Sequence, residues 1–125
     1  MEIDPNNRVA LFVLARNQPA PDEKISALTK VTELHPEYAR AFNEIGIVYG
    51  GTKKLYKEAI TWYEKATQVC PQYASCYNNI GVNQELLKNY DEAIKWYFRG
   101  IEKDKEYKAP HANLLDVYAA KNLDD

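Results

Sequence analysis

The feature that most constrains the fold is an internal repeat. The stretch "YKEAITWYEKAT", which begins at Tyr56, returns as "YDEAIKWYFRGI" at Tyr90, a shift of 34 residues. Upstream of it, "PEYARAFNEIGIVY" from Pro36 matches "PQYASCYNNIGVNQ" from Pro71 at a shift of 35. Repeats of this length are single supersecondary units that bury their apolar faces by stacking on one another. The chain is therefore predicted to form an elongated stack.

The two shifts differ by one residue, and this locates a turn. The extra residue falls between Gly46 and Tyr56, where "GGTKKL" predicts a lengthened turn. A partial third copy, "EYKAPHANLLDVY", begins at Glu106. Apolar residues recur at helical spacing, as at Tyr97 and Ile101, and strand-like alternation is absent. Each unit is therefore predicted to be a helical hairpin.

These units resemble the tetratricopeptide repeat (TPR), a 34-residue helix-turn-helix. The ordered signature of that family is filled by Phe42, Ile45-Gly46, Tyr49, Ala59, Tyr63, Ala66 and Pro71, and most of it again by Tyr77, Ile80-Gly81, Ala93 and Tyr97. The chain departs from the pattern at Gln84, Gly100 and Lys105. The resemblance implies an all-α, right-handed superhelix of antiparallel helical hairpins, with about seven helices.

One TPR domain over residues 1–125 accounts for the whole chain. We expect a degenerate repeat at 5–36, repeats at 37–71 and 72–105, and a closing helix at 106–121. Small residues let paired helices approach closely, whereas Phe12 and Leu115 stand in the glycine's place in the two outermost units, as terminal repeats often allow. Helices are predicted near 6–16, 22–34 and 107–121, with Asp4 and Asp22 as N-caps of the first two.

Composition excludes several classes of partner. The chain has 16 basic and 18 acidic residues and a formal charge of -2, so nucleic acid and anionic membrane surfaces are not expected partners. The longest apolar run, "VALFVLA", is much shorter than the roughly 20 residues of a membrane helix. We expect a cytoplasmic location; the periplasm or another compartment would suit a chain whose signal had been removed.

No set of residues suggests catalysis, a cofactor or a metal site. The only histidines, His35 and His111, are 76 positions apart, and no Gly-rich phosphate loop or nucleophile–base motif is present. His35 falls near a helix end, and His111 falls at an aromatic packing place. Trp62 and Trp96 each precede a packing tyrosine and are expected to be partly buried.

The two cysteines occupy ordinary repeat positions. Cys70 takes the place of His35 and Asp104, and Cys76 takes the place of Ala41 and Pro110. A zinc site needs four ligands close to the metal, and the histidines belong to other units. A disulfide across the inter-repeat turn is left open, because the loop is short enough to permit one.

The resemblance to TPR proteins also implies a binding face. In that family the first helix of each unit lines a concave groove. The positions that would face it are Arg40, Asn43, Glu44 and Ile47, then Ser75, Asn78, Asn79 and Val82, then Ala109, Ala112, Asn113 and Asp116. Asparagine both donates and accepts hydrogen bonds, so it suits a peptide backbone whatever side chains the partner carries. The partner-binding residues are predicted to be Arg40, Asn43, Glu44, Ile47, Asn78, Asn79, Val82, Asn113 and Asp116.

One TPR subfamily grips the C-terminal tail of heat-shock proteins with two lysines, an arginine and two asparagines. Here those places hold Asn43, Ile47, Asn79, Ala109 and Asn113, or Val9, Val13, Glu44, Ser75 and Asn79 if counted from the first unit. The cations are missing, and a terminal carboxylate needs charge-assisted donors. Chaperone tails are therefore not expected to bind.

The sequence favours a non-catalytic scaffold or adaptor that binds a peptide segment of another protein in the groove, selected by shape and polarity more than by charge. Two alternatives stay open. The atypical end helices at 6–16 or 107–121 could meet a second copy, or the chain could be the TPR fragment of a larger protein.

Overall fold

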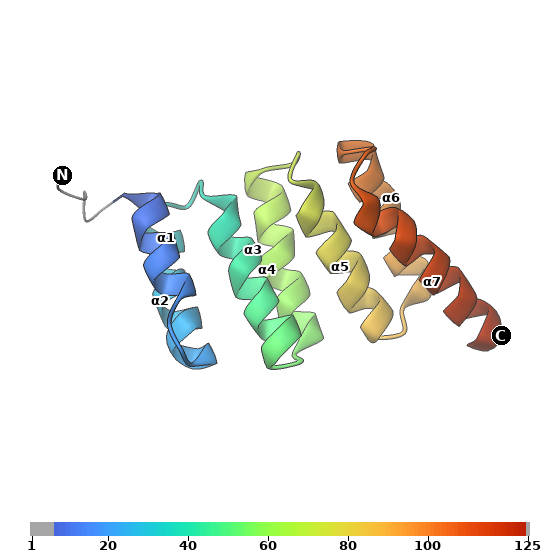
Figure 1. The fold of residues 1–125 in the computed structure, drawn as a ribbon, viewed down its shortest axis with the longest axis horizontal. Helices are drawn as coiled ribbons and strands as arrows, with labels where there is room; N and C mark the ends of the chain where they lie inside the picture. The colour runs from blue at the N-terminus through green and yellow to red at the C-terminus, as the bar shows by residue number, and fades with distance from the viewer. Residues whose placement is uncertain (1–6, 125) are drawn as a thin grey trace.

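The chain folds as a stack of antiparallel helices. The structure is a computed structural model that describes residues 7–124. Its elements are α1 (Arg8–Arg16), α2 (Pro21–Leu34), α3 (Ala39–Ile47), η1 (Val48–Thr52), α4 (Tyr56–Val69), α5 (Ala74–Leu86), α6 (Tyr90–Lys103) and α7 (Lys108–Asp124). The all-α prediction with seven α-helices is confirmed, and no strand occurs within the described range. In Figure 1 the odd-numbered helices form a front layer and α2, α4 and α6 lie behind them.

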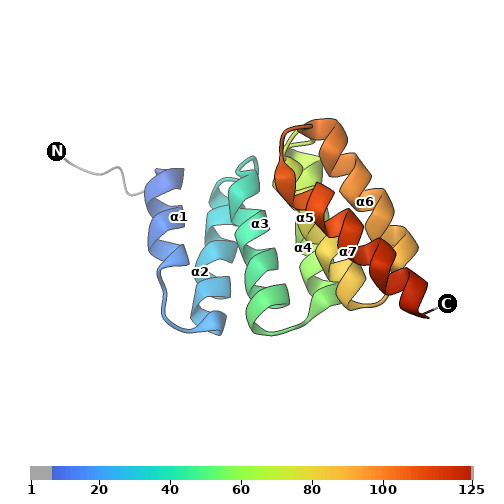
Figure 2. The same cartoon turned by 45° about the vertical axis from the view of Figure 1, so that its right-hand side comes forward.

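The stack has two dissimilar ends. Figure 2 shows α1 at one end, and α7 at the other end lying against α5 and α6. Phe12 on α1 is buried, with 1% of its surface exposed, and packs in the first core cluster with Leu28 and Ile45. Leu115 on α7 holds the equivalent place and is 74% exposed. The large residue at the glycine position is thus a core residue at one end and a surface residue at the other.

The starts of the first two helices were predicted differently from what the structure shows. Asn7 caps α1, because its Oδ1 accepts hydrogen bonds from the backbone N–H groups that open the helix. Asp4 lies outside the described residues. The prediction that Asp22 is an N-cap is wrong, because α2 begins at Pro21 with Ala20 as its cap. Proline's fixed φ suits the first helical position, so the helix starts one residue earlier and Asp22 falls in its first turn.

The lengthened turn is confirmed, and it takes a specific form. The extra residue is absorbed by η1, a π-helical turn that continues α3. The turn closes at Lys54, which has φ of 58°. The hairpin of α5 and α6 closes the same way at Lys88, with φ of 65°, and has no π-turn. One inserted residue has therefore changed the shape of the front face at the end of α3 only.

In each central hairpin, a tyrosine of the second helix packs on a glycine of the first helix. A Cβ atom on Gly46 would lie 2.5 Å from the Tyr63 ring, and one on Gly81 would lie 2.5 Å from the Tyr97 ring. Each ring therefore occupies the space that a side chain would need. Tyr97 is fully buried and donates a hydrogen bond of 2.8 Å to Glu85 Oε1. The close helix approach expected at these glycines is present in both hairpins.

Candidate binding groove

The front layer carries a hollow between α3 and α5. Its volume is about 230 Å³, and its lining residues are Ile47, Gly50, Gly51, Tyr63, Asn79, Val82, Asn83 and Leu86. Three residues predicted to bind a partner, Ile47, Asn79 and Val82, thus line one hollow. The two glycines come from η1, so the π-turn forms one wall. The lining is apolar apart from amide groups and the Tyr63 phenol, a composition that is common in ligand-binding clefts.

The predicted asparagines bind one another across neighbouring units. Asn79 Nδ2 donates to Asn43 Oδ1 at 3.0 Å, and Asn113 Nδ2 donates to Asn78 Oδ1 at 3.0 Å. Asn43 and Asn78 are buried, with 5% and 6% of their surface exposed, whereas Asn79 and Asn113 are half-buried. Each pair therefore has an inner acceptor and an outer donor, and the pairs join α3 to α5 and α5 to α7.

This pairing gives the four asparagines two different roles. Asn43 Oδ1 also accepts from Cys76 Sγ at 3.4 Å, so this amide serves the interior. Among residues 7–124, the side-chain hydrogen bonds of Asn79 and Asn113 start only from their Nδ2 atoms. The Oδ1 atom of each of these two outer asparagines is therefore an acceptor that these side-chain bonds do not use.

Asn83 belongs to the groove and was not predicted. It is buried, its Nδ2 donates to the Asn79 backbone oxygen at 2.8 Å, and its Oδ1 has no hydrogen-bond partner in the described part of the chain. The Oδ1 atom lies against Gly50, where it stands 2.6 Å from the position of a Cβ. The available signal was its spacing of one helical turn from Asn79.

Tyr63 closes the floor of the hollow. Burial raises the pKa of its phenol well above the usual range, and the nearby side-chain amide of Asn83 opposes that rise. The hydroxyl therefore stays protonated at neutral pH and is a neutral polar group. The hollow contains no charged side chain, since its lining residues are apolar, amide or phenol groups.

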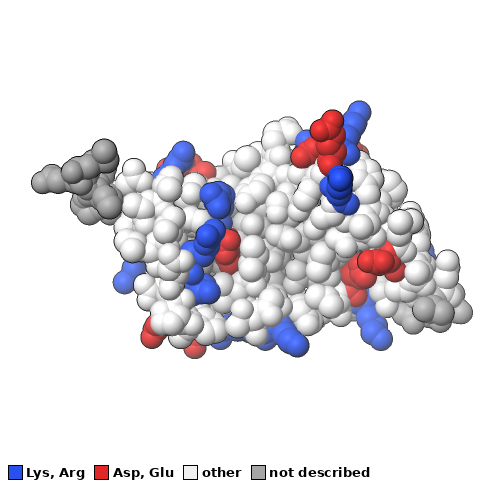
Figure 3. All heavy atoms as spheres, viewed as in Figure 1, with Lys and Arg blue, Asp and Glu red and all other residues white. Residues whose placement is uncertain are grey.

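The remaining predicted residues lie outside this hollow. Arg40 is exposed on α3, and its guanidinium sits 4.9 Å from the centroid of the Phe12 ring. Glu44 is half-buried on α3, and Asp116 is exposed on α7. Figure 3 shows that Lys and Arg side chains gather in a stripe over α1 and α3 on the front face. The front face is therefore basic toward α1 and neutral at the hollow.

Other candidate chemical groups play structural roles. Cys70 and Cys76 are free thiols, and burial raises the pKa of Cys76 to about 12. His35 is the C-cap residue of α2. His111 is exposed, and its Nε2 lies 3.0 Å from the Lys105 backbone oxygen. The prediction that His111 occupies an aromatic packing place is therefore wrong. In the described range, no three His, Cys, Asp or Glu side chains lie together as a metal site would require.

The predicted roles of the tryptophans agree with the structure. Trp62 is partly buried and stacks on Phe42 with ring centroids 6.1 Å apart, and Trp96 is partly buried beside Tyr77 at 5.9 Å.

Over the residues that the structure describes, no helix has the length and apolar character needed to cross a bilayer.

Two family models match the chain directly. A model described as "TPR repeat" matches residues 54–87, and a model described as "Tetratricopeptide repeat" matches residues 74–106. The first match joins α4 to α5, and the second covers the α5–α6 hairpin, in which Gly81 packs on Tyr97. Residues 54–106 are thus matched as tetratricopeptide repeats. A search of curated protein sequences finds no match.

Solved structures with the same TPR fold cover almost the whole chain. The first TPR of Spaghetti (RPAP3), bound to the HSP90 peptide SRMEEVD, aligns over 98% of each chain with 21% identity and a TM-score of 0.83. The first TPR domain of human RPAP3 aligns over 95% of each chain with 21% identity and a TM-score of 0.84. MamA aligns over 96% of this chain and 71% of its own, with 24% identity and a TM-score of 0.81. At these identities the likeness concerns the fold.

Proposed function

We propose that this TPR protein is a non-catalytic scaffold that holds an extended segment of a partner protein along its front face, in the hollow between α3 and α5. The observation that carries this proposal is a groove with apolar walls and outward-facing amide acceptors. Tetratricopeptide repeats are in general protein–protein interaction modules, and stacked repeats present an extended concave surface. The division into units at 5–36, 37–71, 72–105 and 106–121, and the cytoplasmic location, stay predictions.

The proposed contacts use complementary groups. Asn79 and Asn113 offer Oδ1 atoms to backbone N–H groups of the segment, while Ile47, Val82 and Leu86 contact its apolar side chains. Neighbouring packed helices are about 8–10 Å apart, and an extended chain rises about 3.3 Å per residue. The two amides would therefore contact backbone groups about three residues apart. Recognition by main-chain bonds with side-chain pockets between them is a recurring mode of peptide binding.

The test uses a partner obtained by affinity purification and mass spectrometry. Ile47→Ser with Val82→Ser changes two wall residues that make no side-chain hydrogen bond, so the fold should survive, and partner affinity should fall about tenfold or more. Asn79→Ala with Asn113→Ala should also weaken binding. Thr61→Ala, at an exposed position on α4, is the control. Unchanged affinity in both double variants, with helicity intact by circular dichroism, would remove the groove from the function.

Chaperone tails are proposed not to be the ligand, although the similar RPAP3 domain is bound to the peptide SRMEEVD. The positions that should carry the three clamp cations hold Asn43, Ala109 and Asn113, or equally uncharged residues if counted from the first unit. Calorimetry with that peptide is expected to show no binding tighter than about 100 μM. A low-micromolar dissociation constant would contradict this expectation.

Self-association is the second candidate, and the end faces of the stack favour it. A groove of about 620 Å³ runs between α1 and α2 and includes Leu11, Leu14 and Leu34 among its lining residues. At the other end, Leu115 and Tyr118 are 74% and 44% exposed. A head-to-tail contact between these faces would continue the stack. Sedimentation velocity over a hundredfold range of concentration separates this candidate from a monomeric scaffold.

A further inference from the structure

Three arginines on the front face are held over aromatic rings where α1 meets α3. The Arg8 guanidinium lies 5.1 Å from the centroid of Tyr38, Arg40 lies 4.9 Å from that of Phe12, and Arg16 lies 5.6 Å from that of Phe12. These distances are within the range of cation–π contacts. We call Arg8, Arg40 and Arg16 the arginine row.

The row depends on the residue that replaces the usual glycine. Phe12 fills the space between α1 and α3, and its ring meets Tyr38 edge-to-face with centroids 5.5 Å apart. The two rings form a platform for planar guanidinium groups. Side chains held in this way lose less rotamer entropy on binding an anion than free surface lysines do. In the α5–α7 contact, Gly81 stands at the equivalent position, and the described residues contain no such platform there.

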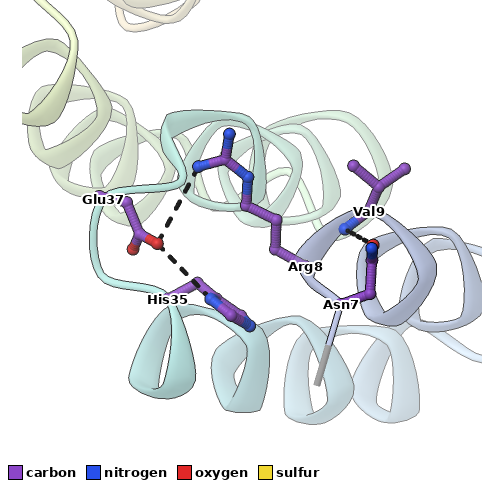
Figure 4. A network of polar contacts seen from close by, with 5 residues as sticks. All are labelled: Asn7, Arg8, Val9, His35 and Glu37. Carbon is purple, nitrogen blue, oxygen red and sulfur yellow. Dashed lines mark hydrogen bonds and ion pairs between the residues drawn. The ribbon is translucent and has the colours of Figure 1, made fainter. Parts of the chain in front are cut away.

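The charge of the row is only partly balanced by the protein. Arg8 lies 4.0 Å from Glu37, which His35 also approaches at 3.5 Å (Figure 4). In the range 7–124, Arg16 and Arg40 take part in no ion pair within 4.0 Å. Glu44 follows Arg40 by one helical turn on α3. The basic stripe in Figure 3 lies over these two helices.

We propose that the arginine row binds an acidic, extended segment of the partner protein whose carboxylates occur at alternate positions. The proposal rests on the proposed function, because the segment would lie on the same front face as the hollow. Arg8 and Arg16 are eight helical residues apart, about 12 Å along α1. Carboxylates at i, i+2 and i+4 of an extended chain lie on one side and span about 13 Å. The guanidinium fork matches a carboxylate with two parallel hydrogen bonds.

A peptide partner fits better than a nucleic acid. The chain carries a formal charge of -2, and three stacked cations with Glu37 and Glu44 beside them are a small basic patch. Nucleic-acid sites depend on many cations that neutralise successive phosphates. A short segment with three alternating carboxylates requires only three cations, one for each carboxylate.

The first experiment compares three capped peptides by 15N–1H NMR titration of the whole chain. The probe is acetyl-Gly-Glu-Ala-Glu-Ala-Glu-Gly-amide; the controls place the three glutamates in succession or replace them with glutamine. We expect the alternating peptide to bind about threefold tighter than the contiguous one and at least about tenfold tighter than the glutamine one, with shifts at α1 and α3 and a loss of affinity at high salt. Equal affinity of all three peptides would overturn the proposal, and so would tighter binding of a single-stranded uridine oligomer.

The second experiment tests the row itself. Arg16→Gln with Arg40→Gln should weaken the alternating peptide about tenfold, while Glu44→Gln should tighten it about twofold. Arg16→Lys with Arg40→Lys keeps the charges and should retain part of the affinity. The matched control is Lys57→Gln with Lys105→Gln, which makes the same change of net charge at exposed positions away from the row. Equal losses in the arginine and lysine double variants would assign the effect to net charge alone and overturn the site.

The two proposals fail in different ways. If Ile47→Ser with Val82→Ser weakens the natural partner and Arg16→Gln with Arg40→Gln does not, the groove function stands and the acidic segment is refuted. If the arginine variant weakens the alternating peptide and no groove variant affects the natural partner, the row binds acidic peptides but the groove function fails.

Discussion

The contacts between front helices are made in two different ways along the stack. Where α1 meets α3, Phe12 and Tyr38 pack edge-to-face and arginines cover the rings. Where α3 meets α5 and α5 meets α7, pairs of asparagine amides form the connection at 3.0 Å. The same repeat position is filled by Phe12 in the first helix and by glycine in the next two. One fold thus presents a charged surface at one end and a neutral, hydrogen-bonding surface in the middle.

The difference shows which part of a repeat sets its surface chemistry. Gly46 and Gly81 leave room for a tyrosine from the second helix of the same hairpin, so that ring is used inside the unit. Phe12 brings its own ring, and the ring faces the neighbouring unit. A single position therefore decides whether aromatic surface is available to hold cations on the front face.

The largest expected effect comes from removing that ring. Phe12→Ala deletes a buried side chain that is 1% exposed, and large-to-small changes of this kind cost about 3–5 kcal/mol. Urea denaturation followed by circular dichroism measures the free energy of unfolding. The control is Leu115→Ala, at the equivalent position but 74% exposed, which should cost less than about 1 kcal/mol. Similar costs for both variants would mean that the two ends of the stack are not different in kind.

An intermediate effect is expected from the amide pairs. Asn113→Ala leaves Asn78 Oδ1 buried without its donor, which should cost about 1–2 kcal/mol. A double-mutant cycle with Asn78→Ala should give a coupling energy of about 1 kcal/mol, because the two side chains bond directly. Strict additivity of the two single changes would show that the amides do not connect α5 to α7. The α5–α7 contact could then no longer be contrasted with the aromatic contact at Phe12.

The last prediction concerns the rate at which a reagent modifies Cys76, and not the free energy of unfolding. Its thiol is fully buried and bonds Asn43 Oδ1, and with a pKa of about 12 only about one part in 10⁴ is thiolate at pH 8. Iodoacetamide at pH 8 should therefore modify the partly exposed Cys70 first, as mass spectrometry of peptides would show. Asn43→Ala should accelerate the reaction at Cys76 by loosening its surroundings. Equal rates at both cysteines in the unchanged protein would contradict the burial on which this expectation depends.

The sequence predicted the fold because the fold depends on local, periodic signals. The repeat spacing located the hairpins, and the change in spacing located the π-turn at Val48–Thr52. Helix starts were harder to predict. Asp22 is a common N-cap residue and Pro21 is common at the first helical position, and the structure shows that α2 begins at Pro21. The family signature marked the front face without showing which asparagines pair, because each pair joins residues 35 or 36 positions apart.

The arginine row could not be predicted from the repeat pattern. Arg40 was singled out as a groove residue, but Arg8 and Arg16 lie in the unit that matches the family least well. Their arrangement follows from the position of the Phe12 and Tyr38 rings between two units, and such contacts depend on how the units pack. Departures from a repeat pattern are thus a useful place to look for surface chemistry.

The tyrosine-on-glycine contact also bears on how the chain reaches its fold. Gly46 meets Tyr63 and Gly81 meets Tyr97, so each contact closes over 16 or 17 residues of chain. Short closures cost little loop entropy and favour fast folding. During synthesis, each hairpin could form its glycine–tyrosine contact soon after its second helix leaves the ribosome. The amide pairs, which need the next unit, would then join hairpins that are already formed.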